Sequence, residues 1–224
     1  FPFRTQQLSS LVPKIVSWKR LVKIGSRRLE YARSESSQGG FLVSEKRKVV
    51  KMELLKIETP RLLLRQFAIG DAEDVFAILS DEQTTLDCGG YHAFEEMDEE
   101  YERLMQKFAA QTRYSIVCRE TGRVIGMMSM MDAERAVPGW EFGIEIAPDA
   151  RRRGYAREAL QAVVQTYFEK TNAEIFTGGH YAYNLASGKL LKAVGFQYEG
   201  VEHKAMRHAT RGATDLVCYY IEKG

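Results

Sequence analysis

The sequence lacks the marks of a membrane-spanning, disulfide-stabilised or metal-binding protein. It has no run of eighteen apolar residues, about the length that a transmembrane helix needs. Its 3 cysteines are odd in number, widely separated and not spaced as metal ligands are. Two of them lie inside apolar strand patterns, so we expect buried free thiols rather than a disulfide or a catalytic nucleophile. We therefore expect a cytoplasmic protein with neither a membrane span nor a metal site.

Acidic residues are scarce in the first part of the chain. Residues 1–51 hold 12 Lys/Arg and 3 Asp/Glu, whereas residues 52–224 hold 20 and 27. We expect Met52 to be the natural start, and residues 1–51 to be upstream sequence, a fusion remnant or a loosely ordered extension. Two alternatives stay open, a basic arm that contacts nucleic acid and an organellar targeting segment, because few acids and many arginines fit both. Basic and aromatic residues are too thinly interleaved to favour a nucleic-acid surface.

The remainder, residues 52–224, is expected to form one globular domain. Apolar residues make up 45% of the chain and charged residues 28%, and no internal repeat is visible. The hydrophobic periodicity predicts the order β-α-α-β-β-β-α-β-α-β-β. The first six elements are expected at 61–67, 72–79 with Asp71 as its cap, 94–110, 114–119, 124–131 and 140–147. A helix from about Gly154, a strand at 174–179, a helix after Asn184 and two closing strands complete the order.

A basic, glycine-bearing turn at 148–157 separates an apolar strand from a long helix. Apolar residues recur at helical spacing from Ala156 onward, so the helix should begin close to Gly154. The first amides of a helix have no intrahelical acceptor and lie at the positive end of its dipole, so they suit a phosphate. Gly154 permits close backbone approach, and Ala156 keeps the mouth of the turn open. Further charge comes from Arg151, Arg152, Arg153 and Arg157. The alternative interpretation is a solvated basic helix start.

Five sequence elements carry a family resemblance. They are Thr59-Pro60-Arg61-Leu62-Leu63-Leu64-Arg65, Arg151-x-x-Gly154-x-Ala156, Asn184-x-x-Ser187, Gly195-Phe196-x-x-Glu199-Gly200 and a closing strand over 215–219. In this order the chain from about 59 to 221 resembles the GCN5-related N-acetyltransferases (GNAT), particularly the branch that acetylates ribosomal-protein N-termini. The resemblance implies an α/β fold with a central mixed sheet, helices on both faces and a parallel strand pair that splays apart.

The resemblance also implies that acetyl-CoA is the co-substrate. By position, Ile144, Glu145 and Ile146 would pair with the pantetheine arm. The turn would hold the pyrophosphate through residues 151–157, which are Arg151, Arg152, Arg153, Gly154, Tyr155, Ala156 and Arg157. Asn184 has two interpretations that stay open, a helix cap alone or a cap that also holds the arm or an ordered water.

The implied reaction is transfer of an acetyl group to a primary amine by direct attack. The attacking nitrogen must be unprotonated, so a base near the cleft is needed. Glu141 is the first candidate, and His180 and Glu145 are the others; the alternatives are a solvated strand face for each glutamate and a satisfied polar side chain for His180. Many family members carry a tyrosine acid where this chain has Leu191, so Ser187 or water would protonate the thiolate instead.

The acceptor is left open by the sequence. A protein N-terminus, a polyamine, an amino acid and an antibiotic all fit the reaction, and so does a different class of function, a noncatalytic acyl-CoA-binding or ribosome-associated module. An acidic set would suit a cationic acceptor, or is a solvated surface: Asp87, Glu95, Glu96, Asp98, Glu99 and Glu100. The oligomeric state is open too, a homodimer included.

Overall fold

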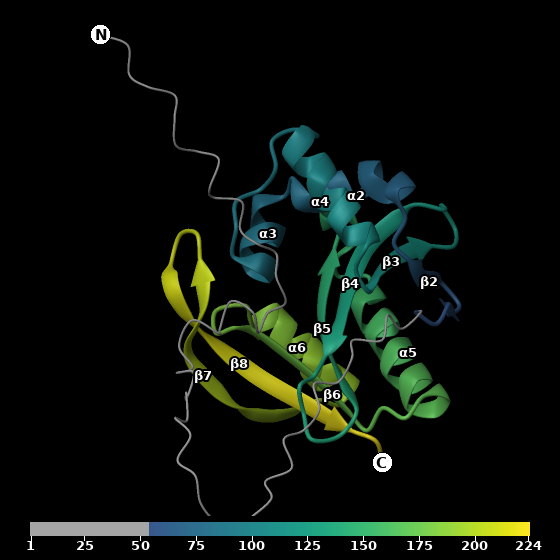
Figure 1. Cartoon of the computed structure of the whole chain (residues 1–224), viewed down its shortest axis with the longest axis vertical. Coiled ribbons are helices and arrows are strands. Elements are labelled where there is room, and N and C mark those ends of the chain that lie inside the picture. The colour runs from purple at the N-terminus through teal and green to yellow at the C-terminus, as the bar shows by residue number, and fades with distance from the viewer. Residues whose placement is uncertain (1–53) are drawn as a thin grey trace, which may run out of the picture.

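The computed structural model describes residues 54–224, which form one mixed sheet flanked by helices (Figure 1). Residues 1–53 lie outside the described part, and with them the expected basic extension and the expected start at Met52. The sheet has eight strands in the order β1-β2-β3-β4-β5-β6-β8-β7. Their bounds are β1 Ile57–Glu58, β2 Leu62–Gln66, β3 Arg113–Cys118, β4 Val124–Asp132, β5 Gly139–Ile146, β6 Ile175–Tyr181, β7 Gln197–His208 and β8 Gly212–Glu222.

Strands β5 and β6 are parallel, and every other neighbouring pair is antiparallel. The helices are α2 Ala72–Leu79, α3 Glu82–Gly89, α4 Glu99–Ala109, α5 Tyr155–Lys170 and α6 Leu185–Val194, with 3-10 turns η1 Ile69–Asp71 and η2 Pro148–Ala150. This arrangement confirms the expected fold class, a mixed α/β sheet with helices on both faces.

Consecutive residues of β3 show which helices cover which face. The Arg113 guanidinium lies 3.8 Å from the centre of the Phe108 ring of α4. The next residue, Tyr114, has its hydroxyl 3.0 Å from the hydroxyl of Tyr167 on α5. Side chains alternate between the faces of a strand, so α4 and α5 lie on opposite faces of the sheet. We call them the α4 face and the α5 face.

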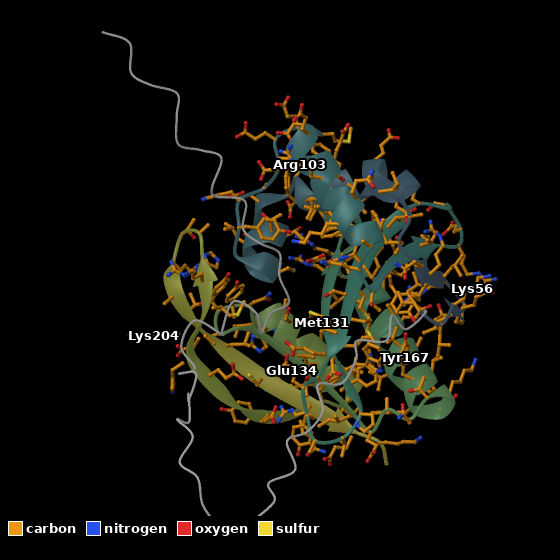
Figure 2. All side chains as sticks on the ribbon, viewed as in Figure 1. Lys56, Arg103, Met131, Glu134, Tyr167 and Lys204 are labelled. Atoms are coloured by element: carbon orange, nitrogen blue, oxygen red, sulfur yellow. The ribbon has the colours of Figure 1, made fainter. Side chains whose placement is uncertain are left out.

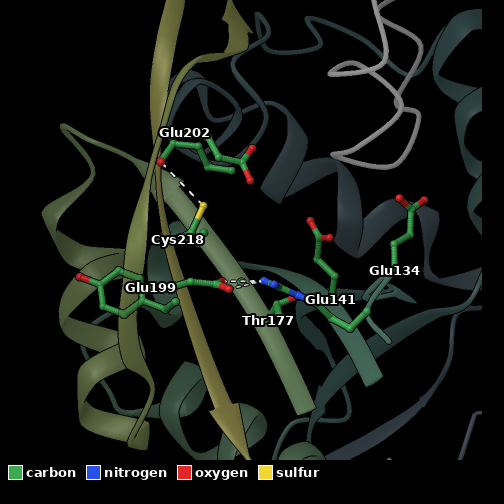
Figure 3. Close-up of a pocket in the computed structure, with 11 residues that line it drawn as sticks. Glu134, Glu141, Thr177, Glu199, Glu202 and Cys218 are labelled. Atoms are coloured by element: carbon green, nitrogen blue, oxygen red, sulfur yellow. Dashed lines mark hydrogen bonds and ion pairs between the residues drawn. The ribbon is translucent and has the colours of Figure 1, made fainter. Parts of the chain in front are cut away.

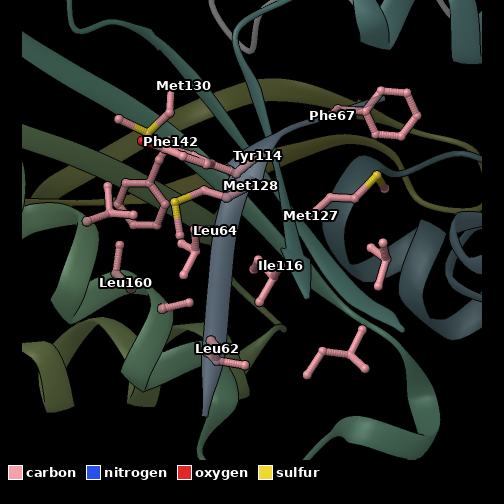
Figure 4. Close-up of a cluster of buried hydrophobic side chains, with 14 of the residues drawn as sticks. Leu62, Leu64, Phe67, Tyr114, Ile116, Met127, Met128, Met130, Phe142 and Leu160 are labelled. Atoms are coloured by element: carbon pink, nitrogen blue, oxygen red, sulfur yellow. The ribbon is translucent and has the colours of Figure 1, made fainter. Parts of the chain in front are cut away.

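The main apolar cluster spans both faces of the sheet, because it includes Leu160 of α5 as well as Val75 of α2 and Phe108 of α4; Figure 4 shows part of it. Trp140 of β5 packs edge-on against Tyr167, with 5.4 Å between the ring centroids. Phe142, two residues on, packs against Phe196 at 5.5 Å. Trp140 and Phe142 therefore share the α5 face, and the alternation of side chains along a strand places Glu141 and Glu145 on the α4 face.

The helices before β3 differ from the expectation. The helix expected over 94–110 begins only at Glu99, because Asp98 caps it by accepting hydrogen bonds from the amides of Glu100 and Tyr101. Helix α3 was not predicted. Its sequence holds two threonines and few apolar residues, so it lacks the stripe by which helices are recognised.

Asp71 is the N-cap residue of α2, as expected. The Asp71 carboxylate is buried and makes no capping bond to α2. It accepts two hydrogen bonds from the Arg65 guanidinium, at 2.8 and 2.6 Å, and one from the Ser115 hydroxyl at 2.6 Å. Burial opposes ionisation, yet these donors outweigh it and lower the pKa of Asp71. Asp71 thus stands at the expected helix end, but its carboxylate belongs to a buried ion pair and not to a side-chain cap.

The three cysteines are free thiols, as expected. Cys118 is buried in β3, which also agrees with the expectation. Cys218 lies in β8, so two of the cysteines are in strands as expected, but Cys218 and Cys88 of α3 are only half-buried.

Candidate active site

The parallel pair β5–β6 separates part-way along its length. The two strands pair from Gly139 opposite Ile175 to Glu141 opposite Thr177, and the pairing stops there. β5 continues to Ile146, held on its other side by β4. The backbone groups that β5 turns toward β6 after Glu141 therefore face an opening in the sheet. Such an edge can form hydrogen bonds with an extended ligand, as an added strand would.

The three residues predicted to bind the pantetheine arm, Ile144, Glu145 and Ile146, all lie in this separated part of β5. The Ile146 carbonyl accepts a hydrogen bond of 3.2 Å from Nε of Arg151. The Cys88 thiol of α3 lies 3.8 Å from the carbonyl oxygen of Ile144. The opening is thus bordered by the turn after β5 and by α3.

The glycine turn after β5 has the backbone that a phosphate site requires. Gly154, with φ of 80°, and Arg152, with φ of 61°, adopt the left-handed conformation, and α5 begins at Tyr155 as expected. Within residues 54–224, the amides of Arg152, Arg153 and Gly154 donate no hydrogen bond. The first backbone bond into the helix comes from the Glu158 amide to the Gly154 carbonyl, at 3.0 Å. Several N–H groups are therefore available at one helix N-terminus.

The four arginines of the turn divide into two groups. Arg151 is bound within the protein, because its Nη2 donates to the Asp81 carboxylate at 2.8 Å and also contacts the Thr84 hydroxyl. Burial opposes ionisation of Asp81, but the bonds from Thr84 and Arg151 outweigh it and lower the pKa. The side chains of the other three are exposed: Arg152, Arg153 and Arg157. Arg151 thus braces the turn against α3, and its neighbours present charge to solvent.

A further arginine, Arg61, supports the turn from the segment before β2. Its Nε donates to the Glu158 carboxylate at 2.6 Å, and its Nη1 donates to the Arg153 carbonyl at 2.9 Å. The guanidinium also lies 4.6 Å from the centre of the Tyr155 ring. Sequence reasoning did not assign this role, although Arg61 belongs to the opening motif. Ala156, in the first turn of α5, is half-buried.

Glu141 lies where β5 and β6 separate, on the α4 face, and lines an open pocket. Thr177, its partner on β6, lines the same pocket. The other lining residues include Glu134, Arg135, Glu199 and Glu202, from the β4–β5 connection and from β7. Sequence reasoning assigned a site role to Glu141 and to none of these others, although Glu199 belongs to one of the family motifs.

His180 lies on the opposite face of the sheet from Glu141. It is three residues after Thr177 on β6, and alternation places the two on different faces. The imidazole is buried, packs face to face with Tyr219 and lies against α6, where a Cβ on Gly188 would come within 2.7 Å of Nε2. Its Nδ1 lies 2.8 Å from the Tyr181 carbonyl oxygen, so Nδ1 carries a proton. The two predicted bases are not brought together.

Glu145, the third candidate base, is paired with Arg113. Their closest charged atoms, Oε2 and Nη1, are 3.7 Å apart. Burial raises the pKa of the Glu145 carboxyl, and the Arg113 charge opposes that rise. Arg113 was not singled out in the sequence, because a single arginine at a strand start carries no motif.

Asn184 caps α6, since its Oδ1 accepts a hydrogen bond of 3.1 Å from the Ser187 amide. Its Nδ2 also donates to the Asp87 carbonyl of α3 at 3.0 Å. Both ends of the amide are thus engaged inside the protein. Ser187 is half-buried in the first turn of α6, whereas Leu191 is buried in the core. Ser187 is therefore closer than Leu191 to a site at the start of the helix.

Comparison with known proteins decides the family. A family model described as "Acetyltransferase (GNAT) domain" matches residues 61–197. The chain belongs to the GNAT acetyltransferases. It is 33% identical over 158 residues to the "Uncharacterized N-acetyltransferase YoaA" of Bacillus subtilis, covering 67% of this chain and 87% of that one. The family is thereby established, whereas the expected ribosomal-protein branch is not.

Solved structures agree on the fold. A GNAT-family acetyltransferase from Bacillus anthracis superposes with a TM-score of 0.68 at 22% identity, over 75% of this chain and 99% of that one. Spermidine N-acetyltransferase from Vibrio cholerae, solved with CoA and spermine, superposes with a TM-score of 0.62 at 20% identity, over 74% and 97%. At such identities the likeness concerns the fold.

Two further findings concern residues 54–224 only. No helix in that range is both long and apolar enough to cross a membrane. No three or more His, Cys, Asp or Glu side chains of the same range are grouped so that they could hold a metal ion.

Proposed function

We propose that this GNAT protein transfers an acetyl group from acetyl-CoA to a primary amine by direct attack, with Glu141 as the general base. The observation that carries the proposal is the position of Glu141, where β5 leaves β6. On one side of it the β5 backbone runs toward the glycine turn, and on the other lies the acidic pocket. A donor and an acceptor can therefore meet beside one carboxylate.

The residues present fit acetyl-CoA. The separated backbone of Ile144–Ile146 can pair with the amides of an extended arm, and the amides of 152–154 can bind its pyrophosphate. Arg152, Arg153 and Arg157 would add charge-assisted bonds. A structural neighbour of the same fold was solved with CoA, which supports this assignment. Bound acetyl-CoA would supply an acetyl group activated as a thioester.

Glu141 would take a proton from the ammonium form of the acceptor, directly or through water, so that the nitrogen lone pair can form the new C–N bond. As the C–S bond breaks, the nitrogen would lose its second proton, and the Ser187 hydroxyl or a water would give a proton to the sulfur and regain one from the nitrogen, so that CoA leaves as a free thiol. Leu191 has no proton to give and is buried. General acid–base catalysis of this kind contributes about 10²–10⁴-fold to a rate.

Release of free thiol from acetyl-CoA across a panel of primary amines tests the proposal. We expect turnover with at least one amine, and we expect Glu141→Gln to lower it while acetyl-CoA binding persists. The buried Leu191, where an acid is common, favours the second candidate, a noncatalytic acyl-CoA-binding module. Tight CoA binding without turnover on peptide N-termini or on small amines would support that module and contradict the proposal.

A further inference from the structure

The pocket beside Glu141 is strongly acidic. Its lining includes the carboxylates of Glu134, Glu141, Glu199 and Glu202, and within the described lining the one basic side chain is Arg135. These residues come from the β4–β5 connection, β5 and β7, so no single segment of the sequence indicates this pocket. A concave site with this excess of negative charge attracts cations and raises their local concentration.

Arg135 occupies this acidic pocket as a cation would. Its guanidinium lies 2.6 Å from the Glu199 carboxylate. Figure 3 shows the dashed line of this ion pair beside Thr177 and Glu141. Both partners are about one third exposed, at 38% and 33%, so the pair is in contact with solvent and can exchange for another cation.

The lining of the pocket includes a buried polar atom without a hydrogen-bond partner among the described residues. Thr177 is only 6% exposed, and its hydroxyl forms no hydrogen bond within the described part of the chain. Buried hydroxyls are nearly always hydrogen-bonded, so this one is suited to a donor or acceptor that arrives with a ligand. Thr177 is paired with Glu141, which brings the hydroxyl next to the proposed base.

We propose that this pocket binds the second positive charge of the acceptor, and that the acceptor is a small diamine or polyamine-like molecule. This rests on the proposed function and adds a substrate class to it. The reacting amine lies at Glu141, and the second ammonium lies among Glu134, Glu199 and Glu202 after displacing Arg135 from Glu199. The Thr177 hydroxyl accepts a hydrogen bond from one of the two nitrogens.

The acidic run singled out in the sequence is not part of this pocket. Glu95 and Glu96 are exposed and stand before α4, and neither lines the pocket. Arg103 of α4 and Glu134 lie at well-separated places on the molecule (Figure 2). The pair Glu95 and Glu96 therefore supplies a matched control, because its replacement by glutamine removes two negative charges elsewhere.

The experiment compares n-butylamine with 1,4-diaminobutane, which differ by the second ammonium. In the wild-type protein we expect kcat/KM to be at least about tenfold higher for the diamine, because partly buried carboxylates attract a nearby cation. In the double variant Glu199→Gln, Glu202→Gln this ratio falls to near one. In Glu95→Gln, Glu96→Gln it keeps the wild-type value. Arg135→Gln, which removes the competing cation, lowers KM for the diamine several-fold.

Calorimetry of both amines against the CoA-bound protein keeps the two proposals distinguishable. Diamine binding that depends on Glu199 and Glu202, without turnover of any amine, would overturn the proposed function and leave the pocket assignment standing. Equal kcat/KM for the two amines, or preference for a peptide N-terminus without a basic side chain, would overturn the pocket assignment and leave the reaction standing. A rise of KM in Arg135→Gln would also contradict it, since Arg135 would then assist the acceptor.

Discussion

The two ends of β5 offer different kinds of binding group. After Glu141 the strand offers backbone groups and leads into a turn whose amides and exposed arginines suit an anion. Beside and before Glu141 the neighbouring side chains are carboxylates, which suit a cation. We call these the donor half and the acceptor half. A binding site made of backbone groups is determined by the local conformation of one segment. A binding site made of side chains depends on which strands are neighbours in the sheet.

The largest effect is expected at the boundary between the halves. Glu141→Gln keeps the shape of the side chain and removes its basicity, so kcat should fall about 10²–10³-fold. The dissociation constant for acetyl-CoA, measured by calorimetry, should stay within about twofold. A variant with wild-type kcat would remove Glu141 from the role of base.

Asp71 tests whether the stability of the α4 face can be changed without changing the affinity of the donor half for acetyl-CoA. Asp71→Asn leaves Arg65 without its anion and should lower the free energy of unfolding by about 1–3 kcal/mol at neutral pH, with acetyl-CoA affinity unchanged. The folded pKa of Asp71 is lowered, so its stabilisation is complete above the unfolded value, about 4, and is lost as pH falls through the folded value. Urea unfolding at several pH values should show the two proteins converging in acid. A constant difference down to pH 2 would contradict this account.

Gly154 tests the donor half directly. Its φ of 80° is strained for any residue with a Cβ, so Gly154→Val should distort the turn and weaken acetyl-CoA binding by about tenfold or more. Gly122, with φ of 72° in the β3–β4 hairpin and open space around it, offers a control of matched backbone strain. Gly122→Val should cost similar stability and leave acetyl-CoA affinity intact. Equal losses of affinity in both variants would mean that general destabilisation, and not the turn, is responsible.

The smallest effect is expected at Asn184, which ties α6 to α3 beside both halves. Asn184→Ala removes the cap on α6 and the bond to Asp87, and should lower the free energy of unfolding by about 1 kcal/mol. Asn184→Asp keeps the capping oxygen and should recover most of that loss. If Asn184→Ala also weakened acetyl-CoA binding, and Asn184→Asp did not restore it, the amide would have a binding role beyond the cap.

The strand, turn and helix of the donor half could be predicted from the sequence because their signals are local. The alternation over Trp140–Ile146 and the helical stripe that begins at Ala156 fix a strand, a turn and a helix within a few residues of one another. The contacts of Arg151 with α3 could not be predicted in this way. Its partners Asp81 and Thr84 belong to α3, and that helix has no apolar stripe to reveal it.

The acceptor half could not be assembled from the sequence. Arg135 is in a connection, Thr177 is on β6, and Glu199 and Glu202 are on an edge strand that approaches them only through the pairing of β6 with β8 and of β8 with β7. Of these four residues only Glu199 belongs to a sequence motif, and that motif does not indicate an acceptor site. The contacts of Asp71 could not be predicted for the same reason: it is the N-cap residue of α2 as expected, but Ser115 of a distant strand binds its carboxylate.

The central claim is that donor binding depends on the backbone after Glu141 and on the glycine turn, whereas proton removal depends on the Glu141 carboxylate. Its most direct test is the rate of thiol release at rising acetyl-CoA concentration, with one amine held at saturation, for Gly154→Val and Glu141→Gln. We predict that Gly154→Val approaches the wild-type maximal rate once acetyl-CoA saturates it, and that Glu141→Gln reaches saturation at the wild-type concentration with a maximal rate that stays low. Recovery of Glu141→Gln by excess acetyl-CoA, or a maximal rate of Gly154→Val as low as that of Glu141→Gln, would contradict the account.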